Sequence, residues 1–304
     1  MIKLTIRQME YFEAVTQTLH FGRAAEMVGV TQPALSTQIA EMEEKLGCKL
    51  FERSGRTVHL TEDAQALKPR IEAVLVQTRE IEAYAQRGRS VMAGRFRLGI
   101  IPTVAPYLLP RLLPALKEQF PDLNVELREA VTGILIEETA AGRLDAMIAA
   151  LPVEHRALVV EPLFEDQFFL AVPGNDPEFV NPPVPPESPA LDRLMLLEEG
   201  HCMREQALAV CTNARPAAIA NYGATSLTTL LQMVAHGQGV TLIPEMAVTA
   251  GPPIPELKVV PFAEPTPSRK IALAWRRNSS RQDDYEAVAG IIRDVASSAK
   301  QMQC

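Results

Sequence analysis

Cysteine is scarce in this sequence, and the few cysteines lie far apart. The 304 residues include four, Cys48, Cys202, Cys211 and Cys304. Four scattered thiols cannot form the disulfide framework of a small secreted protein. The chain also lacks an apolar run of about 20 residues, which a membrane span requires. Its opening segment alternates polar and apolar residues, unlike a secretion signal. We therefore expect a cytoplasmic protein with no membrane partner, in which a close cysteine pair is more often redox-active or metal-binding than structural.

The sequence also lacks an excess of positive charge. The formal net charge is -7, and the first sixty residues carry seven basic and seven acidic side chains. Nucleic-acid binding, if present, must therefore depend on a local surface rather than on the global field. Hydrophobic residues make up 47% and charged residues 22% of the chain, which is typical of a globular protein. This length is enough for about two or three domains.

The first sixty residues have the pattern of three short helices and a β-wing. The first helix carries an apolar stripe at helical spacing. A short helix over 23–28, closed by Gly29, precedes a longer helix that ends at Gly47. Thr31 can cap this longer helix, and Pro33 falls in its first turn. Two helices joined by so tight a turn indicate a helix-turn-helix, and the polar turn at 54–56 suits a wing.

The exposed side of the third helix has side chains suited to reading DNA. Short hydroxyl and amide side chains form hydrogen bonds with base edges in a major groove. Arginines flanking that side can bind phosphates. The candidate DNA-binding residues are Arg23, Thr31, Gln32, Pro33, Ser36, Thr37, Gln38, Arg53 and Arg56. The alternative is an all-helical protein-interaction domain with a polar surface.

A long helix is expected to follow Thr61, which is a good N-cap. Its apolar positions mostly alternate at spacings of three and four residues, as in the seam of a two-stranded coiled coil. They are Ala64, Leu67, Ile71, Val74, Ile81 and Ala85. A lone helix of this length is poorly stable, which favours pairing with a second subunit. Pro69 should kink the helix or mark a late start, and the helix should end by 88–90, before Gly94.

From about residue 95 the sequence alternates strand and helix patterns. The expected strands are 96–101, 125–130, 146–151 and 271–275, and the expected helices are 108–120, 133–141 and 283–299. This alternation predicts an α/β fold with parallel sheets covered by helices. The proline-rich stretch 181–189 is expected to be a surface loop.

Three stretches of the N-terminal region resemble the winged helix-turn-helix of LysR-type transcriptional regulators. They are Phe21-Gly-Arg-Ala-Ala-Glu, Thr31-Gln-Pro-Ala-Leu-Ser-Thr-Gln-Ile and Leu46-Gly-Cys-Lys-Leu-Phe-Glu-Arg. The sequence departs from the family at Asp63-Ala64, where Ala-Gly is usual. The resemblance extends over essentially the whole chain. It implies a winged helix-turn-helix and linker helix, followed by two Rossmann-like α/β subdomains that form a periplasmic-binding-protein-like effector module.

This resemblance implies the domain boundaries. Residues 1–60 would bind DNA, 61–90 would form the linker and dimerisation helix, and 95–304 would be the regulatory domain. Subdomain I would comprise about 95–164 and 271–304, and subdomain II about 165–270.

A second resemblance concerns the segment Gly200-His-Cys, with Cys211 nine residues after Cys202. It is similar to the peroxide-sensing OxyR branch of the LysR family, and several flanking segments match that branch as well. They are Ile101-Pro-Thr-Val, Pro106-Tyr-Leu-Leu-Pro, Glu129-Ala-Val-Thr, Ala224-Thr-Ser-Leu and Thr241-Leu-Ile-Pro. The resemblance implies that Thr103, Thr132 and His201 line the peroxide pocket and that Arg269 supports the reacting oxygens. Taken singly, each threonine is more typical of a cap or a strand, and Arg269 of a hinge salt bridge.

The residues around Cys202 favour thiol chemistry on independent grounds. A sensor thiol needs a lowered pKa and access to solvent. Gly200 permits an irregular entry to a helix expected from Met203, so Cys202 should lie near a helix N-terminus, which favours an anion. His201 and Arg204 can add hydrogen bonds or positive charge. Because Glu198 and Glu199 would oppose ionisation, we expect both to face water.

Oxidation of this thiol would change the local structure. Peroxide converts a thiolate to a sulfenic acid, which a second thiol, here Cys211, converts to a disulfide. In a continuous helix the two cysteines lie ~13 Å apart along the axis, at ~1.5 Å per residue. A disulfide needs Cα atoms within ~7 Å, so the bond requires the helix to unwind. We expect this refolding to reach the subunit interface and change the DNA contacts.

The remaining cysteines have simpler interpretations. Cys48 lies in an apolar run and is expected to be a packed thiol, and the terminal Cys304 to be incidental. A metal site built from His201, Cys202, Cys211 and His236 is an alternative, although no usual zinc spacing is present.

Three functions remain open from the sequence. The favoured one is a peroxide-responsive regulator, by resemblance an activator of antioxidant genes, without a cofactor, a metal or enzyme activity. The second is a LysR-type regulator that responds to a small metabolite, and the third is a thiol peroxidase enzyme. The expected partners are a double-stranded DNA operator, hydrogen peroxide, further copies of the chain in a dimer or tetramer, RNA polymerase, and a thiol reductant such as glutaredoxin or thioredoxin.

Overall fold

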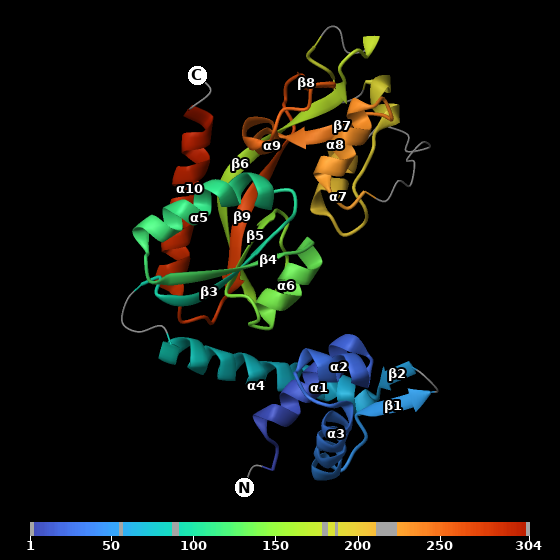
Figure 1. Ribbon diagram of the computed structural model, residues 1–304, viewed down its shortest axis with the longest axis vertical. Helices are drawn as coiled ribbons and strands as arrows, with labels where there is room; N and C mark the ends of the chain where they lie inside the picture. The colour runs from blue at the N-terminus through green and yellow to red at the C-terminus, as the bar shows by residue number, and fades with distance from the viewer. Residues whose placement is uncertain are drawn as a thin grey trace. The chain divides into compact units, whose positions relative to one another are not determined.

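The computed structural model describes residues 3–54, 57–86, 91–177, 182–185, 188–210 and 224–301 (Figure 1). The chain divides into two compact units, Met1–Ala85 and Gln86–Cys304. We describe each unit by itself. Among the described residues, no helix is both long and apolar enough to cross a lipid bilayer.

The N-terminal unit is a winged helix-turn-helix followed by a long helix. Its elements are α1 (Ile6–Thr18), α2 (Phe21–Met27), α3 (Gln32–Leu46), β1 (Phe51–Ser54), β2 (Thr57–Leu60) and α4 (Glu62–Gln86). β1 and β2 form an antiparallel pair, which is the expected wing. Phe12, Leu35, Met42 and Leu50 are fully buried, and they share one core with residues of α2 and of the wing.

Side-chain caps set the helix boundaries in this unit. Thr31 caps α3 by accepting a hydrogen bond from the backbone N–H of Ala34, and Gly47 ends α3 in the left-handed conformation. Both features were expected. α2 begins at Phe21, two residues earlier than predicted, because Nδ1 of His20 accepts hydrogen bonds from the N–H groups of Gly22 and Arg23. Histidine is an uncommon N-cap, so the pattern of capping residues did not indicate it.

α4 begins at Glu62 and continues through Pro69, so a late start of this helix was wrong. Thr61 caps it as expected, accepting from the N–H of Ala64. The apolar stripe of α4 divides into two sets. Ala64, Ile71 and Leu75 are buried within the N-terminal unit, whereas the later Ile81 and Tyr84 are each 71% exposed. The exposed second set is available to a partner subunit.

The second unit is built on a mixed sheet. Its strands are β3 (Gly94–Ile100), β4 (Leu123–Glu129), β5 (Ala146–Ala150), β6 (Leu158–Pro173), β7 (Thr241–Pro244), β8 (Leu257–Pro261) and β9 (Ser268–Arg276). Its helices are α5 (Ala105–Gln119), α6 (Thr132–Ala140), the 3-10 helix η2 (Pro189–Arg193), α7 (Cys202–Val210), α8 (Leu227–Ala235), α9 (Glu245–Ala250) and α10 (Gln282–Gln301).

The strand directions contradict the expectation that the sheets are wholly parallel. In the order β4-β3-β5-β9-β6-β7, with β8 also paired to β6, only β3–β4 and β3–β5 are parallel. The pairs β5–β9, β6–β9, β6–β7 and β6–β8 are antiparallel. β9 lies between β5 and β6 and runs antiparallel to both, so β5 and β6 run in the same direction although only the short segment 151–157 joins them. The α/β class and the two lobes of the prediction are confirmed, but the wholly parallel sheets are not.

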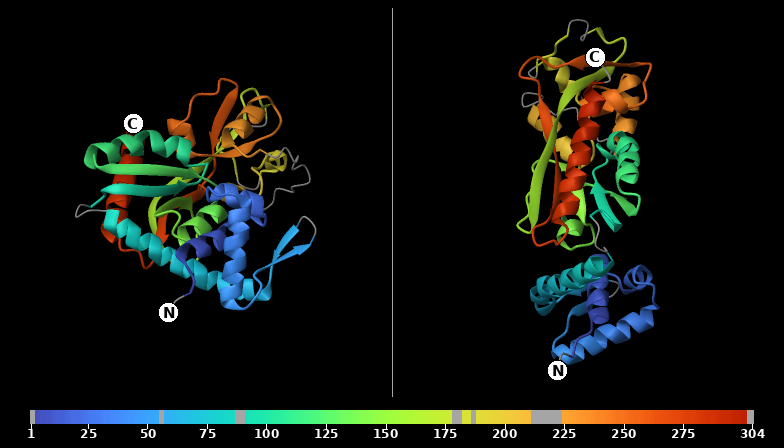
Figure 2. Two further views of the ribbon diagram at one scale, coloured as in Figure 1. Left: turned by 60° about the horizontal axis from the view of Figure 1, so that its bottom comes forward. Right: turned by 90° about the vertical axis from the view of Figure 1, so that its left-hand side faces the viewer.

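Two hydrophobic cores lie within this unit. The first includes Leu98, Ile148, Trp275 and Ile292, and the second includes Leu170, Leu230 and Leu242. β6 is 16 residues long and contributes to both, with a β-bulge between Pro162 and Phe164. The right-hand view of Figure 2 shows it extending beside α10 along the unit. α5 and α6 form the crossovers of β4-β3-β5, and right-handed crossovers put them on opposite faces.

One buried carboxylate holds the wing against α3. Glu43 accepts hydrogen bonds from the backbone N–H groups of Leu50 and Phe51 and from Lys49 Nζ. We predict that Glu43→Ala lowers the free energy of unfolding of the N-terminal unit by about 1–3 kcal/mol, because two buried N–H groups lose their acceptor. Calorimetric unfolding of the full chain measures the change. Its neighbour Glu44 is exposed, so Glu44→Ala is the matched control. Equal effects of both substitutions would contradict this role of Glu43.

Candidate functional site

Four of the predicted site residues line one small cavity in the second unit. Thr103, Thr132, His201 and Cys202, with Ile101, Pro102 and Val131, enclose about 160 Å³ of empty space, mouth included. They come from three segments far apart in the sequence. The loop before α5 supplies Thr103, the start of α6 supplies Thr132, and the start of α7 supplies Cys202.

Cys202 is the first residue of α7 and is a half-buried free thiol. Thr132 is likewise the first residue of α6. The cavity therefore lies at the N-termini of two helices, where partial positive charge favours a thiolate or another anion. This is the setting that the sequence predicted for Cys202.

The turn before Cys202 depends on Gly200, which has a φ of +90°. A side chain at that position would be strained in the left-handed region. Glu198 and Glu199 are exposed, as expected. Arg204 donates a hydrogen bond of 2.9 Å from Nη1 to the carbonyl oxygen of Leu197. Its guanidinium thus secures the turn, whereas the sequence offered it as a direct partner of the thiol.

His201 lies beside the thiol and is only 7% exposed. Burial lowers the pKa of its imidazole below the ordinary value, although the carboxylate of Glu198 acts in the opposite direction. The ring is consequently neutral at neutral pH. Of the two roles that the sequence suggested for His201, the structure favours hydrogen bonding over positive charge.

The two threonine hydroxyls are held differently. Thr132 Oγ1 is buried and has no hydrogen-bond partner among the described residues. Thr103 is 2% exposed, and its Oγ1 accepts a hydrogen bond of 2.9 Å from Nη1 of Arg269. A buried hydroxyl without a partner is costly, and it suits a small polar molecule that donates or accepts a hydrogen bond.

Arg269 lies behind Thr103 and is not among the residues that line the cavity. Its side chain is fully buried, and it forms a salt bridge of 2.9 Å with Asp166. It also donates to the carbonyl oxygen of Thr103 at 3.1 Å. Arg269 therefore acts on the cavity through Thr103. Removing one partner from such a buried pair costs about 3–5 kcal/mol.

Three residues around the site were missed from the sequence. Asp166 pairs with Arg269, and burial raises the pKa of its carboxyl although Arg269 acts in the opposite direction. Nη2 of Arg269 also contacts Met246 Sδ at 3.6 Å. Gln206 on α7 donates to the carbonyl oxygen of Leu151, just after β5. No motif marks these residues, since their partners are distant in the sequence.

Among the described residues, Cys202 is the one cysteine that lines this cavity. Cys211 and Cys304 lie outside the described residues. Cys48 is half-buried in the N-terminal core, and burial with the carboxylates of Asp63 and Glu43 raises the pKa of its thiol. This fits the prediction of a packed thiol. Within the described part of the chain, no three histidine, cysteine or carboxylate side chains gather as a metal site would require.

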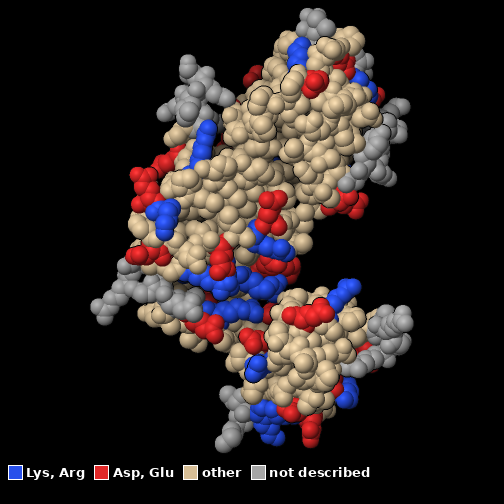
Figure 3. All heavy atoms as spheres, in the orientation of Figure 1, with Lys and Arg blue, Asp and Glu red and all other residues tan. Residues whose placement is uncertain are grey.

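Five of the nine candidate DNA-binding residues are exposed to solvent. Arg23, Thr31, Gln32, Pro33 and Thr37 are exposed, and Ser36 is half-buried. Gln38 Nε2 donates to Glu41 and its Oε1 accepts from Gln8, so the amide is engaged within the unit. Arg56 and the side chain of Arg53 lie outside the described residues. Figure 3 shows basic and acidic side chains interspersed on this unit, in keeping with its balanced charge.

Comparison with known proteins relates both units to one family. The lysR-family model of bacterial regulatory helix-turn-helix proteins matches residues 6–65. The model of the LysR substrate binding domain matches residues 89–297. The hydrogen peroxide-inducible genes activator of Haemophilus influenzae is 38% identical over 97% of this chain and 98% of its own length. The DNA-binding transcriptional dual regulator OxyR of Escherichia coli is 38% identical over 95% of each chain.

Solved structures give the same relationship. A cysteine variant of full-length OxyR from Pseudomonas aeruginosa superposes with a TM-score of 0.72 at 35% identity, covering 95% of this chain and 97% of that one. A cysteine-to-serine variant of OxyR from Corynebacterium glutamicum with hydrogen peroxide bound has a TM-score of 0.67 at 31% identity, covering 98% and 94%.

The buried imidazole predicts a pH dependence of stability. The pKa of His201 is lower in the folded chain than its ordinary value of 6.5, so the unfolded chain binds the proton more readily. The contribution of His201 to stability is therefore complete above pH 6.5 and is lost as the pH falls below it. We expect His201→Gln to reduce the loss of melting temperature on acidification, measured on both sides of that pH. An unchanged pH profile in the variant would contradict the burial of a neutral ring.

Proposed function

This chain belongs to the lysR family of bacterial regulatory proteins, and we propose that it is a hydrogen-peroxide-sensing activator of transcription in which Cys202 is the reacting thiol. The observation that carries the proposal is the convergence of Cys202, His201, Thr103 and Thr132 on one cavity. Relatives covering nearly the whole chain are named for activating peroxide-inducible genes. A solved relative holds hydrogen peroxide itself.

The cavity supports a two-step thiol oxidation. The Cys202 thiolate attacks one oxygen of hydrogen peroxide, the O–O bond breaks, and the products are a sulfenic acid and hydroxide, which takes up a proton to become water. The hydroxyl of Thr132 and the neutral ring of His201 are suited to hold the peroxide by hydrogen bonds. The Cys211 thiol then attacks the sulfenic sulfur, and a disulfide and a second water form.

Arg269 serves as a positioning residue in this scheme. It fixes both the hydroxyl and the carbonyl of Thr103 while its own charge is balanced by Asp166. Because the Thr103 hydroxyl accepts from Arg269, its proton remains available for donation to a peroxide oxygen. The support that Arg269 gives to the reacting oxygens is thus exerted through Thr103.

The length of α7 converts oxidation into a structural change. Cys202 and Val210 are its first and last residues, so their Cα atoms lie ~12 Å apart along the axis at ~1.5 Å per residue. A disulfide to Cys211 brings its Cα to ~6 Å from that of Cys202, and adjacent Cα atoms are ~3.8 Å apart. Val210 must then come within ~10 Å, which requires α7 to unwind at least in part. Unwinding would also break the hydrogen bond from Gln206 to Leu151.

The same proposal assigns the domains and partners. Residues 1–60 bind an operator through α3 and the wing, residues 61–90 join subunits, and residues 95–304 sense peroxide through subdomains I and II. The exposed Val74, Ile81 and Tyr84 on α4 support pairing with a second copy, as a dimer or tetramer. RNA polymerase would read the change in DNA contacts, and a glutaredoxin or thioredoxin would restore the thiols. We infer that the protein acts in the cytoplasm, where its DNA target is.

The two alternative functions predict different behaviour of the protein. A regulator that binds a metabolite would require a ligand in the cleft and no reaction at Cys202. A thiol peroxidase would require repeated turnover, which a disulfide that unwinds a helix makes slow. Sustained consumption of peroxide in the presence of a thiol reductant would favour the enzyme over the sensor.

We predict that substoichiometric hydrogen peroxide forms a Cys202–Cys211 disulfide in the full-length protein, detected by mass spectrometry of its peptides. Cys202→Ser should abolish the disulfide and the transcriptional response while DNA binding by the reduced protein persists. Cys48→Ser is the matched control and should respond normally, because its thiol has a raised pKa. Absence of the disulfide at micromolar peroxide would refute the sensor.

A second prediction tests the unpartnered hydroxyl. Thr132 and Thr139 both lie in α6, and each has a buried Oγ1 without a partner among the described residues, but only Thr132 lines the cavity. Thr132→Val should slow oxidation of Cys202 by about tenfold or more, the effect of one lost hydrogen bond. Thr139→Val should leave the rate unchanged. Stopped-flow measurement of thiol loss compares the two, and equal rates would show that the hydroxyl does not contact peroxide.

A further inference from the structure

The residues that line the cavity of Cys202 divide into two sets by their chemistry. The polar set supplies the thiol, the imidazole and the two threonine hydroxyls described above. The apolar set consists of Ile101, Pro102 and Val131, whose side chains offer no hydrogen bond. The enclosed space is about 160 Å³, mouth included. Because a water molecule in the liquid occupies about 30 Å³, this space suits an oxidant of only a few heavy atoms.

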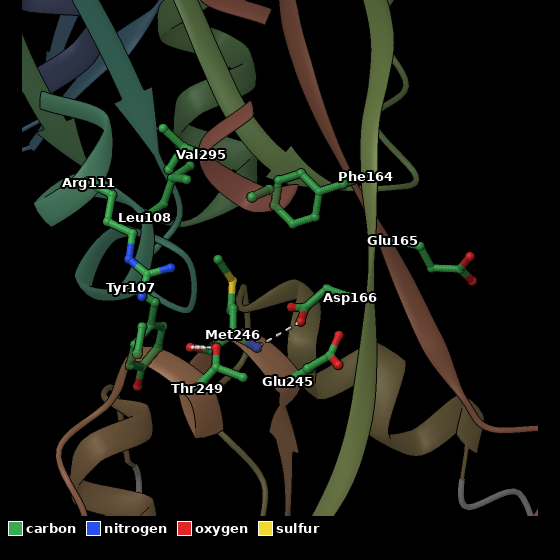
Figure 4. A pocket seen from close by; sticks show the side chains of 12 residues that line it. Tyr107, Leu108, Arg111, Phe164, Glu165, Asp166, Glu245, Met246, Thr249 and Val295 are labelled. Atoms are coloured by element: carbon green, nitrogen blue, oxygen red, sulfur yellow. Dashed lines mark hydrogen bonds between the residues drawn. The ribbon is translucent and has the colours of Figure 1, made fainter. Parts of the chain in front are cut away.

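The larger cavity of the same unit is separate from the thiol. It encloses about 470 Å³, mouth included, and Figure 4 shows Asp166 and Met246 on its wall. Among the described residues, none lines both cavities. Arg269 binds Asp166 of the larger cavity and Thr103 of the smaller one, so its buried side chain lies between them. The size of an oxidant that reaches Cys202 is therefore set by the smaller cavity.

Val131 lies where the apolar wall of the small cavity meets the solvent. Ile101 is 1% exposed and belongs to the core, whereas Val131 is half-buried. A β-carbon placed on Gly200 would lie 3.7 Å from Cγ2 of Val131, so the valine packs against the turn that leads to Cys202. A β-branched side chain has little freedom at χ1, so this part of the wall does not rotate aside easily.

Local backbone chemistry does not explain a valine at this position. Val131 is the N-cap of α6, and its side chain forms no hydrogen bond with the helix. Ser, Thr, Asp and Asn are favoured at N-caps, and valine is among the least favoured residues. Val104 is likewise the N-cap of α5, but it is fully buried in a core, whereas Val131 belongs to neither core of this unit. A residue that departs from a local rule without a packing reason often serves function.

We propose that Val131 restricts the oxidant of Cys202 to hydrogen peroxide by excluding the alkyl group of an organic hydroperoxide. This inference rests on the function proposed above. With ethyl hydroperoxide, the Cys202 thiolate attacks the terminal oxygen and the O–O bond breaks. A sulfenic acid forms, and ethoxide leaves and takes up a proton to become ethanol. The ethyl group is attached to the leaving oxygen, which the polar set holds, so it must lie against the apolar set. Val131 occupies the space that this group requires.

The selectivity of the full-length protein for its oxidant tests the assignment. Hydrogen peroxide and ethyl hydroperoxide are used separately, and rapid quenching followed by mass spectrometry measures the loss of the Cys202 thiol. Val131→Ala removes two carbon atoms, as many as the ethyl group contains. We expect this variant to lower the ratio of the two rate constants, hydrogen peroxide over ethyl hydroperoxide, by about tenfold or more, since a single methylene in an apolar pocket is worth about 10–200-fold.

Two further variants separate cavity size from other effects. Ile134→Ala is the matched control, because Ile134 also lies on α6, is 44% exposed and does not line the cavity. Val131→Thr keeps the branched shape, so its ratio should match that of the unaltered chain even where the added hydroxyl changes both rates. A general loss of stability would affect both oxidants alike, because they react at the same thiol, and would leave the ratio unchanged.

The outcomes distinguish this inference from the proposed function. An unchanged ratio in Val131→Ala, or an equal change in Val131→Thr, would overturn the role of Val131. Equal rates of the two oxidants in the unaltered chain would also overturn it, while the sensing of hydrogen peroxide would stand. Oxidation of Cys202 by hydrogen peroxide no faster than that of Cys48 would refute the proposed function, and this inference with it.

Discussion

The buried pair of Arg269 and Asp166 is the interaction on which the regulatory unit depends. The two residues lie directly opposite each other in the β6–β9 ladder. A charge with no exposure to water must be balanced where it lies, and Asp166 balances it at 2.9 Å. The remaining guanidinium N–H groups bind Thr103 and contact Met246. One side chain thus joins the central strands, the loop before α5 and the start of α9.

The thiol site is assembled from the ends of elements rather than from within them. Thr132 and Cys202 each begin a helix, and Thr103 lies in the loop before α5. This arrangement gives Cys202 the electrostatic benefit of helix termini and leaves α7 with one end at the thiol. In the proposed mechanism, oxidation of Cys202 would act directly on the first turn of a helix that is nine residues long. In that mechanism, reactivity and structural response would have the same origin.

The sequence predicted features that depend on neighbouring residues. The cap at Thr31, the stop at Gly47 and the start of α7 beside Gly200 follow from local backbone chemistry. Strand direction in the sheet was mispredicted, because β9 comes from a distant part of the sequence and runs antiparallel between β5 and β6. Asp166 and Met246 gave no signal, since their contacts with Arg269 join positions distant in sequence. Thr103 and Thr132 were identified by resemblance alone, because an isolated threonine has no pattern that indicates a ligand.

The continuity of β6 limits how the two lobes can move. This single strand supplies side chains to both cores and carries ladders to β9, β7 and β8 along its 16 residues. Opening the lobes as two hinged plates would bend a strand that is hydrogen-bonded for most of its length. We therefore expect the strands of the regulatory unit to form a stiff frame, in which α7 and the turn before it are the segment that changes conformation. Unwinding of α7 in the proposed mechanism would therefore change the surface around that helix without requiring β6 to bend.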